Sequence, residues 1–220
     1  MNTNNAKEYI RLGLPKNLDP DRYTVLAAGS VLLAIPAMAG FENRAGFVFW
    51  AMIFIFGVST VAVFVLSLKR FTIFNTTFKQ LLMQAIVSMT WFLQTMLLLL
   101  FLFLSTYGWH IGLLLLYLPS TIVPIVSCVL TSKGLKREKP FSHKPVYYGA
   151  TVAIGGAVGH SVFWCHLVLK DINYGSSIVL ALALCMILCA IFSLGILSVQ
   201  KLYYYYKLKK YNLLPEEFGQ

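Results

Sequence analysis

The chain has 220 residues, of which 58% are hydrophobic and only 12% carry a charge. Charged residues make up about a quarter of an ordinary soluble domain, so this composition excludes a soluble globular protein. The formal net charge is +10, and the placement of the basic residues along the chain decides what that excess means.

Hydrophobic residues come in blocks about as long as a bilayer is thick. A membrane-spanning helix needs roughly 20 apolar residues at 1.5 Å rise per residue. Six segments reach this length: 23–39, 45–68, 81–104, 111–130, 146–169 and 176–199. The predicted fold class is therefore an all-α integral membrane protein, a bundle of six transmembrane helices. Residues 23–199 form the membrane domain, between an N-terminal tail of residues 1–22 and a C-terminal tail of residues 200–220.

The lysines and arginines lie on alternate sides of the six spans. Sixteen of the 18 fall in the two tails and in the connections 69–80 and 131–145, whereas the other three connections hold only Arg44 and Lys170. This is the positive-inside pattern, and it predicts that both termini are cytosolic (N-in/C-in). We expect a multi-pass protein of the plasma (inner) membrane, with the lipid bilayer rather than nucleic acid as the partner of its basic residues.

The first span leaves two alternatives open. It ends in Pro36-Ala37-Met38-Ala39-Gly40, a helix breaker followed by the Ala-x-Ala of a signal-peptidase site. Cleavage after Ala39 would leave five spans, whereas an uncleaved helix bent near Pro36 is the plainer interpretation. Upstream, residues 6–14 either form a short helix on the inner membrane face or belong to a disordered tail.

Two basic segments border the predicted cytosolic side. The connection 69–80 alternates bulky apolar residues with polar ones, and it either anchors in the lipid interface or docks a cytosolic partner. The candidate docking residues are Lys69, Arg70, Phe71, Phe74 and Phe78. The tail segment 201–211 carries a run of tyrosines flanked by lysines, which suits the lipid headgroup zone.

The third and fourth spans differ in composition. The third carries polar residues in its first half, and we expect its outer half, rich in leucine and phenylalanine, to face lipid. The fourth contains Pro119 and Pro124, each of which removes a backbone donor, so we expect a kink or local unwinding near the bilayer centre. Short connections predict three antiparallel hairpins, formed by spans one and two, three and four, and five and six.

The fifth span carries a stripe of small residues. Gly149, Ala153, Gly156 and His160 are spaced four, three and four apart and share one face, which Gly155 and Gly159 widen. Such a face allows another helix to approach closely, or it marks a hinge. An imidazole in lipid needs a partner, so His160 either bonds a neighbouring carbonyl or hydroxyl or serves a ligand, ion or proton.

Polar residues from four spans fall near the bilayer centre when they are counted from the span ends. These candidates for a midplane cavity are Ser59, Thr60, Gln94, Ser120, Thr121 and His160. Polar groups and broken helices at mid-depth are typical of solute pathways. Hydrogen bonds between helices explain the same residues equally well.

Catalytic chemistry finds little support. The eight acidic residues all lie in tails and connections, which excludes an intramembrane carboxylate, and no recognised catalytic motif is present. We therefore predict no catalytic residue and no cofactor. The cysteines lie within spans and read as buried apolar thiols. Cys185 and Cys189 with His160 are the alternative, a site for a soft metal ion.

The predicted function is a membrane-embedded, permease-like transport component with a small polar midplane cavity between the third, fourth and fifth spans. In span number and orientation the chain resembles the membrane subunits of bacterial ATP-driven exporters, in which a cytosolic segment between spans two and three contacts the ATPase. It is also similar in this respect to small vitamin-uptake subunits. The resemblance implies a cytosolic ATPase or another membrane subunit as partner, and a homo-oligomer is a further possibility. The alternative function is a non-transporting assembly, sensing or immunity factor that acts through helix–helix contacts.

Overall fold

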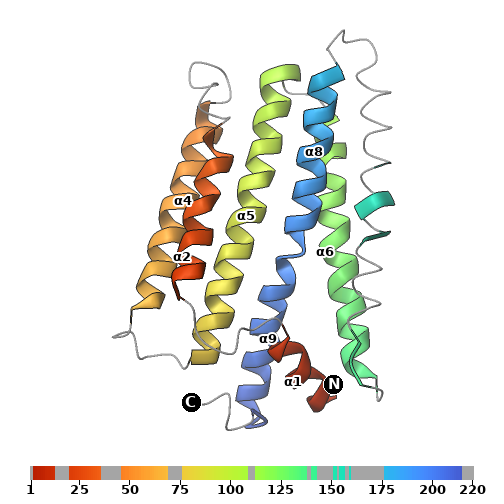
Figure 1. The fold of residues 1–220 in the computed structure, drawn as a ribbon. Helices are drawn as coiled ribbons and strands as arrows, with labels where there is room; N and C mark the ends of the chain where they lie inside the picture. The colour runs from red at the N-terminus through yellow and green to blue at the C-terminus, as the bar shows by residue number, and fades with distance from the viewer. Residues whose placement is uncertain are drawn as a thin grey trace.

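The structure, a computed structural model, describes residues 2–12, 20–35, 46–68, 76–108, 112–137, 140–142, 151–152, 154–156, 159 and 176–214. Within these ranges the chain is helical and contains no strand (Figure 1). The elements are α1 (Thr3–Arg11), α2 (Pro20–Gly29), the 3₁₀ turn η1 (Ser30–Leu33), α4 (Gly46–Ser67), α5 (Thr76–Tyr107), α6 (Gly112–Lys136), α8 (Ser176–Ser193) and α9 (Ile196–Lys210).

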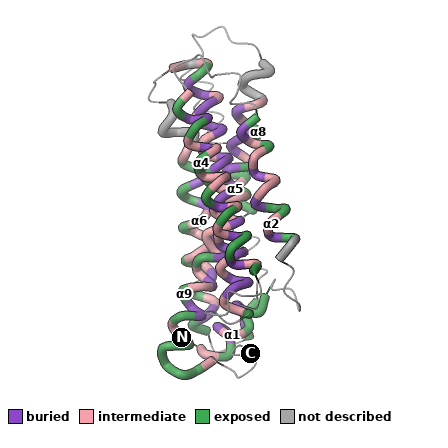
Figure 2. The backbone as a smooth tube through the Cα atoms, turned by 90° about the vertical axis from the view of Figure 1, so that its left-hand side faces the viewer, coloured by how far each residue is buried: buried purple, intermediate pink, exposed green. Residues whose placement is uncertain are grey.

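Four described helical segments are long and apolar enough to cross a membrane. They are Gly46–Ser67, Thr76–Thr106, Tyr117–Lys136 and Ala181–Lys210. These segments overlap the second, third, fourth and sixth predicted spans. The all-helical class is confirmed for the described residues, and these apolar helices are compatible with a membrane protein, whereas the count of six spans and their orientation stay predictions. Large apolar side chains stay exposed along the outer helices, among them Trp50, Phe54 and Phe64 of α4 (Figure 2). Side chains of this kind are suited to lipid rather than to water.

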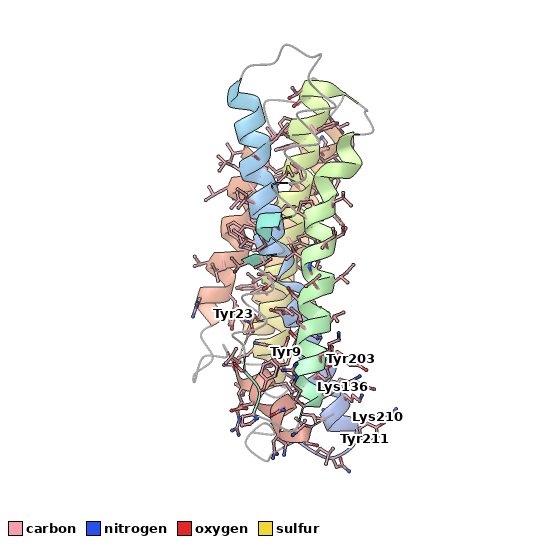
Figure 3. The ribbon with its side chains drawn as sticks, turned by 90° about the vertical axis from the view of Figure 1, so that its right-hand side faces the viewer. Tyr9, Tyr23, Lys136, Tyr203, Lys210 and Tyr211 are labelled. Carbon is pink, nitrogen blue, oxygen red and sulfur yellow. The ribbon has the colours of Figure 1, made fainter. Side chains whose placement is uncertain are left out.

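One end of the bundle gathers the described basic residues, and we call it the basic end. The start of α5, the end of α6 and the end of α9 meet there in an apolar cluster with α1. Lysines and arginines surround this cluster, and Figure 3 shows Lys136 and Lys210 at the same end as Tyr9. The basic tails and connections that alternate with the spans in the sequence therefore meet at one end of the folded bundle, as far as they are described.

The N-terminal segment forms a helix rather than a disordered tail. The Asn2 Oδ1 atom accepts hydrogen bonds from the backbone N–H groups of Asn4 and Asn5, at 3.1 and 3.4 Å, and so caps α1. One side of α1 is buried against α6 and α9 at the basic end. The tyrosine run of α9 is divided in the same way, because Tyr204 and Tyr205 are buried in the cluster whereas Tyr203 and Tyr206 are exposed.

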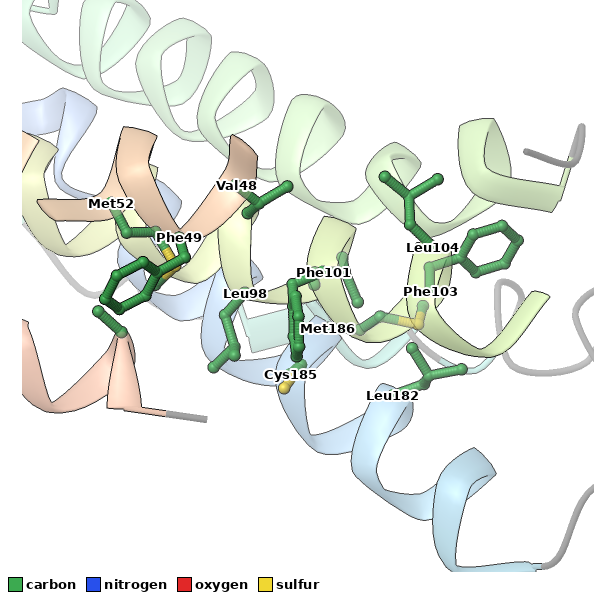
Figure 4. Packing of buried hydrophobic residues seen from close by; sticks show 12 residues of the cluster. Val48, Phe49, Met52, Leu98, Phe101, Phe103, Leu104, Leu182, Cys185 and Met186 are labelled. Atoms are coloured by element: carbon green, nitrogen blue, oxygen red, sulfur yellow. The ribbon is translucent and has the colours of Figure 1, made fainter. Parts of the chain in front are cut away.

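The central helix of the bundle is α5. It packs against α2, α4, α8 and α9, and its outer half forms the main apolar core with α4 and α8 (Figure 4). The buried residues of that half are Leu98, Leu99, Phe101, Phe103 and Leu104. The expectation that this half faces lipid is therefore wrong. A helix that is surrounded by neighbours is apolar all round, and periodicity does not distinguish it from a helix that is surrounded by lipid.

The neighbours of each helix agree only in part with the predicted hairpins. α2 packs on α4, which confirms the first hairpin. α5 and α6 touch each other only sparsely, because both pack mainly on α8 and α9. The expected close pairing of the third and fourth spans is therefore wrong over most of its length: a short connection brings two helix ends together but does not stop a third helix from packing between them.

The sixth span is interrupted, whereas the fourth is not, and the alternative of a kink at the prolines of the fourth span stays a prediction. α6 is helical without a break through Pro119 and Pro124, so the expected unwinding is not found there. α8 stops at Ser193 and α9 begins at Ile196. Between them the N–H groups of Leu194 and Gly195 donate to the carbonyls three residues earlier, at 3.1 and 2.9 Å, which is the tighter 3₁₀ pattern.

Gly195 explains why the sixth span breaks at this point. A Cβ atom added to Gly195 would lie 2.8 Å from Ser88 Cβ and 3.0 Å from Ser88 O on α5. The absence of a side chain lets the two helices approach at backbone distance, as small residues do in membrane proteins. Close packing at Gly195 thus positions α8 and α9 on the central helix.

The first predicted span is described as far as Ile35. α2 begins at Pro20 and continues into η1, which ends at Leu33. The helix-breaking Pro36 and the cleavage site after Ala39 lie outside the described residues.

We predict that Gly195→Ala lowers the free energy of unfolding in detergent by about 1–3 kcal/mol, because the added methyl group overlaps the α5 backbone. Thermal unfolding followed by size-exclusion chromatography measures the change. Gly57→Ala is the matched control, because nothing lies within 4 Å of a Cβ at that position. The control is expected to be neutral or stabilising by about 0.4–1 kcal/mol. Equal effects of the two substitutions would contradict the close contact.

Candidate functional site

Gln94 is the most buried large polar residue near the middle of the bundle. It lies on α5 with 0% of its surface exposed. Its Nε2 atom donates to the Met52 carbonyl of α4 at 2.7 Å. Its Oε1 atom has no hydrogen-bond partner among the described residues. Leaving such an atom buried and unpaired costs about 1–3 kcal/mol, so Gln94 is retained at some expense in stability.

Ser120 of α6 presents a second unpaired group at a similar depth. The residue is 2% exposed, and its Oγ atom has no conventional partner within the described part of the chain. Pro124 has no N–H, so the Ser120 carbonyl also lacks its usual donor four residues later. The Cys189 thiol of α8 lies beside the side chains of Ser120 and Thr95. A thiol is a weak hydrogen-bonding group and satisfies the Ser120 hydroxyl poorly. The Thr95 hydroxyl donates to carbonyls of its own helix, those of Trp91 and Phe92, at 3.0 and 2.8 Å.

Thr95 of α5, Ser120 of α6 and Cys189 of α8 lie together at mid-depth. We call these three residues, with Tyr117 of α6 and with Gln94, which precedes Thr95 and bonds to α4, the mid-depth polar cluster. Tyr117 connects α6 to α5 because its hydroxyl donates to the Met96 carbonyl at 2.9 Å. The cluster involves the sixth span, which the sequence did not single out at this depth for polarity. Among the described residues, the polar contacts at this depth join spans three, four and six, and the predicted cavity between spans three, four and five stays a prediction.

The other predicted midplane residues are placed differently. Ser59 donates to the Phe56 carbonyl of its own helix at 3.0 Å, and Thr121 is exposed and donates to the Leu118 carbonyl at 2.9 Å. The Oγ1 atom of Thr60 is buried without a partner among the described residues. His160 lies outside them. A shared cavity for all six residues stays a prediction.

The small-residue stripe of the fifth span is only partly described. Gly149, Ala153 and His160 lie outside the described residues. Gly155, Gly156 and Gly159 are helical and exposed, and within the described part of the chain nothing lies within 4 Å of a Cβ at these positions. The close helix approach expected on this span stays a prediction, and a close approach of another kind is found at Gly195.

The predicted docking and metal-binding residues are described only in part. Lys69, Arg70, Phe71 and Phe74 lie outside the described residues. Phe78 packs against the Tyr205 ring at the basic end, with ring centroids 5.6 Å apart. Cys185 and Cys189 are buried free thiols, and the described residues hold no group of three histidine, cysteine or acidic side chains that would bind a metal ion.

A second polar network lies near the basic end, and no pattern in the sequence predicted it. Gln200 of α9 donates from Nε2 to Ser132 Oγ at 3.0 Å and to the Cys128 carbonyl at 3.2 Å. The Tyr9 hydroxyl of α1 lies 3.1 Å from Gln200 Oε1 and from the Leu197 carbonyl, within hydrogen-bonding distance of both.

Lys201 adds a second contact to α1. It is 7% exposed, donates to the Leu12 carbonyl and lies over the Tyr9 ring. The basic tail residues thus hold α1 in place.

Two hollows lined by described residues lie away from the mid-depth cluster. An apolar groove of about 430 Å³ lies between α2, α5 and the α8–α9 break, lined in part by Trp91 and Phe192. A polar hollow of about 470 Å³ lies along α1, lined in part by Asn5 and Arg11. Neither is lined by Gln94 or Ser120.

Comparisons of the chain with protein-family models, with curated proteins and with solved structures find no match. The chemistry of the polar residues therefore carries the functional interpretation.

We predict that Gln94→Leu leaves the free energy of unfolding unchanged or raises it by up to about 2 kcal/mol. The substitution removes one interhelical hydrogen bond worth about 0.6–2 kcal/mol and relieves an unpaired oxygen of similar or larger cost. Gln94→Ala is the matched variant, and we expect it to destabilise by about 2–5 kcal/mol because it leaves a cavity. Denaturation in mixed micelles measures both. A large loss with leucine would mean that the amide is needed for packing.

Proposed function

We propose that the chain is a membrane-embedded transport component of the permease type, in which the mid-depth polar cluster contacts the solute. The observation that carries the proposal is a pair of buried atoms without a hydrogen-bond partner among the described residues, Gln94 Oε1 and Ser120 Oγ. Polar groups are expensive in the membrane interior, and those without a structural partner are typical of sites that bind a ligand or line a solute path.

The proposed arrangement is six spans with both termini in the cytosol of a bacterial inner membrane. The gathering of basic residues at one end of the described bundle supports this orientation, because the positive-inside rule places such an end in the cytosol. The first and fifth predicted spans complete the count. The basic end also carries the start of α5, which directly follows the connection 69–80.

The absence of acidic residues from the candidate spanning segments limits the possible energy sources. The four candidate spanning segments contain no acidic residue, so coupling through an intramembrane carboxylate is excluded for them. Energy then comes from the solute gradient or from a partner. A cytosolic ATPase that docks on Lys69, Arg70, Phe71, Phe74 and Phe78 is the partner we propose.

The alternative function is a non-transporting assembly, sensing or immunity factor. Hydrogen bonds between helices favour it, since Gln94, Trp91 and Tyr117 each donate to a carbonyl of a neighbouring helix, at 2.7, 2.9 and 2.9 Å. In that case the polar residues serve helix association, and the double substitution Gln94→Leu with His160→Leu leaves the biological function intact.

Thiol labelling tests the solute path without knowledge of the solute. In a background free of the four native cysteines, we expect Ser120→Cys in membrane vesicles to react with hydroxyethyl methanethiosulfonate, a small neutral reagent, at least tenfold faster than Ile122→Cys. Ile122 lies on the same helix but is exposed on the lipid-facing side. Equally slow reaction at both positions, from both sides of the membrane, would leave the polar cluster with a structural role only.

The proposed partner is tested by intact-complex mass spectrometry after gentle detergent extraction from native membranes. We expect a stoichiometric cytosolic ATPase, and we expect Phe71→Ala with Phe74→Ala to release it while Phe54→Ala, on the lipid-exposed side of α4, does not. A lone or self-associated chain would exclude the ATPase-coupled version. Transport down the solute gradient would then be the form of the proposal that remains.

A further inference from the structure

The buried face of α6 carries three hydroxyl groups in line. Ser120, Ser127 and Thr131 are spaced seven and four residues apart, so at 100° per residue they lie within about 20° of a common direction. Their exposed fractions are 2%, 0% and 0%. The three residues extend from the mid-depth cluster to the basic end.

These hydroxyls, like that of Thr60 on α4, differ from most others in the same bundle. Serine and threonine in an apolar helix usually donate to a carbonyl three or four residues earlier. Thr90, Thr106 and Ser193 do so here, at 2.8, 2.7 and 2.7 Å. Ser120, Ser127 and Thr131 have no hydrogen-bond partner among the described residues. Their free hydroxyls therefore favour a polar molecule in this interface.

The line of hydroxyls is continued by polar groups at both ends. Toward the basic end, the Gln200 network begins at Ser132, the residue after Thr131, and connects α6 to α9 and to Tyr9 of α1. Toward the middle, Ser120 lies beside Cys189 and Thr95, and Thr95 is followed back along α5 by Gln94 with its unpaired Oε1. Polar residues thus recur at intervals along α6 and its neighbours from the basic end to mid-depth.

We propose that this face of α6 lines a path for water and small uncharged hydrogen-bonding solutes, leading from the basic end to the mid-depth cluster. The proposal rests on the proposed transport function and names its solute class and the side from which the solute enters. Hydroxyl and amide groups both donate and accept hydrogen bonds, as water and small polyols or amides do. Among the described residues of α6 from Tyr117 to Thr131 there is no charged side chain to balance an ion.

Cysteine scanning along α6 tests the path. In the cysteine-free background, we expect Ser127→Cys and Thr131→Cys to react with hydroxyethyl methanethiosulfonate at least tenfold faster than Ile125→Cys and Val129→Cys. The controls lie on the same helix at the same depths and are exposed on its other side. We also expect the neutral reagent to react at least tenfold faster than its trimethylammonium analogue at Ser127→Cys and Thr131→Cys. Reaction is expected only from the basic side.

Each result has a separate meaning. Fast labelling of Ser120→Cys with slow labelling of Ser127→Cys and Thr131→Cys would overturn this path and leave the proposed function standing. Slow labelling at Ser120→Cys as well would overturn both. Equal rates with the charged reagent would overturn the assignment to uncharged solutes.

Hydroxyl-radical footprinting of the unsubstituted protein gives a second readout that needs no folded variant. Val123 lies on the same face of α6 between Ser120 and Ser127, and Val63 lies in the core between α4 and α5; both are 0% exposed. Radicals form from water, so we expect oxidation of Val123 to exceed that of Val63 at least threefold. Equal protection of the two valines would show that the α6 interface is dry and would overturn the path.

Discussion

Packing of α5 against four neighbouring helices is the constraint on which the rest of the structure depends. Lipid competes with helices for apolar side chains on nearly equal terms, so helix association in a membrane relies on close packing and a few polar contacts. α5 collects both. Its outer half forms the main core with α4 and α8, and Ser88 in its inner half lies against Gly195 at backbone distance. The sixth span breaks at that point and divides into α8 and α9, which then separate α5 from α6.

Polar residues in the bundle fall into groups with different physical roles. Some hydroxyls bond to their own helix, as Thr90 and Ser193 do, and contribute little to specificity. Others connect helices through a donor to a carbonyl, as Gln94 and Tyr117 do. The buried hydroxyls of Ser120, Ser127 and Thr131 have no partner in the part of the chain that the structure describes and belong to neither group. Their cost in stability is the physical basis of the proposed solute path.

The basic end indicates the proposed orientation in the membrane, and α1 covers it. Lysines and arginines mark it as the side facing anionic lipid and the cytosol in the proposed orientation. α1 covers this end by burying Ala6, Tyr9 and Ile10 against the ends of α6 and α9. Tyr9 also contacts Gln200, which borders the hydroxyl line of α6. The same helix therefore contributes to stability and lies where a solute from the basic side would enter.

The sequence by itself determined the helical class, the membrane character, the first hairpin and the gathering of charge at one end, because each depends on composition and length along a single segment. It also identified Gln94 and Ser120 as polar groups near the middle of the bundle. Three matters were decided only by the tertiary structure: the burial of the outer half of α5, the insertion of the sixth span between α5 and α6, and the break at Gly195 rather than at Pro119 or Pro124. An apolar helix has the same composition whether lipid or protein surrounds it, so its neighbours are determined by side-chain shape at each crossing and not by hydrophobicity.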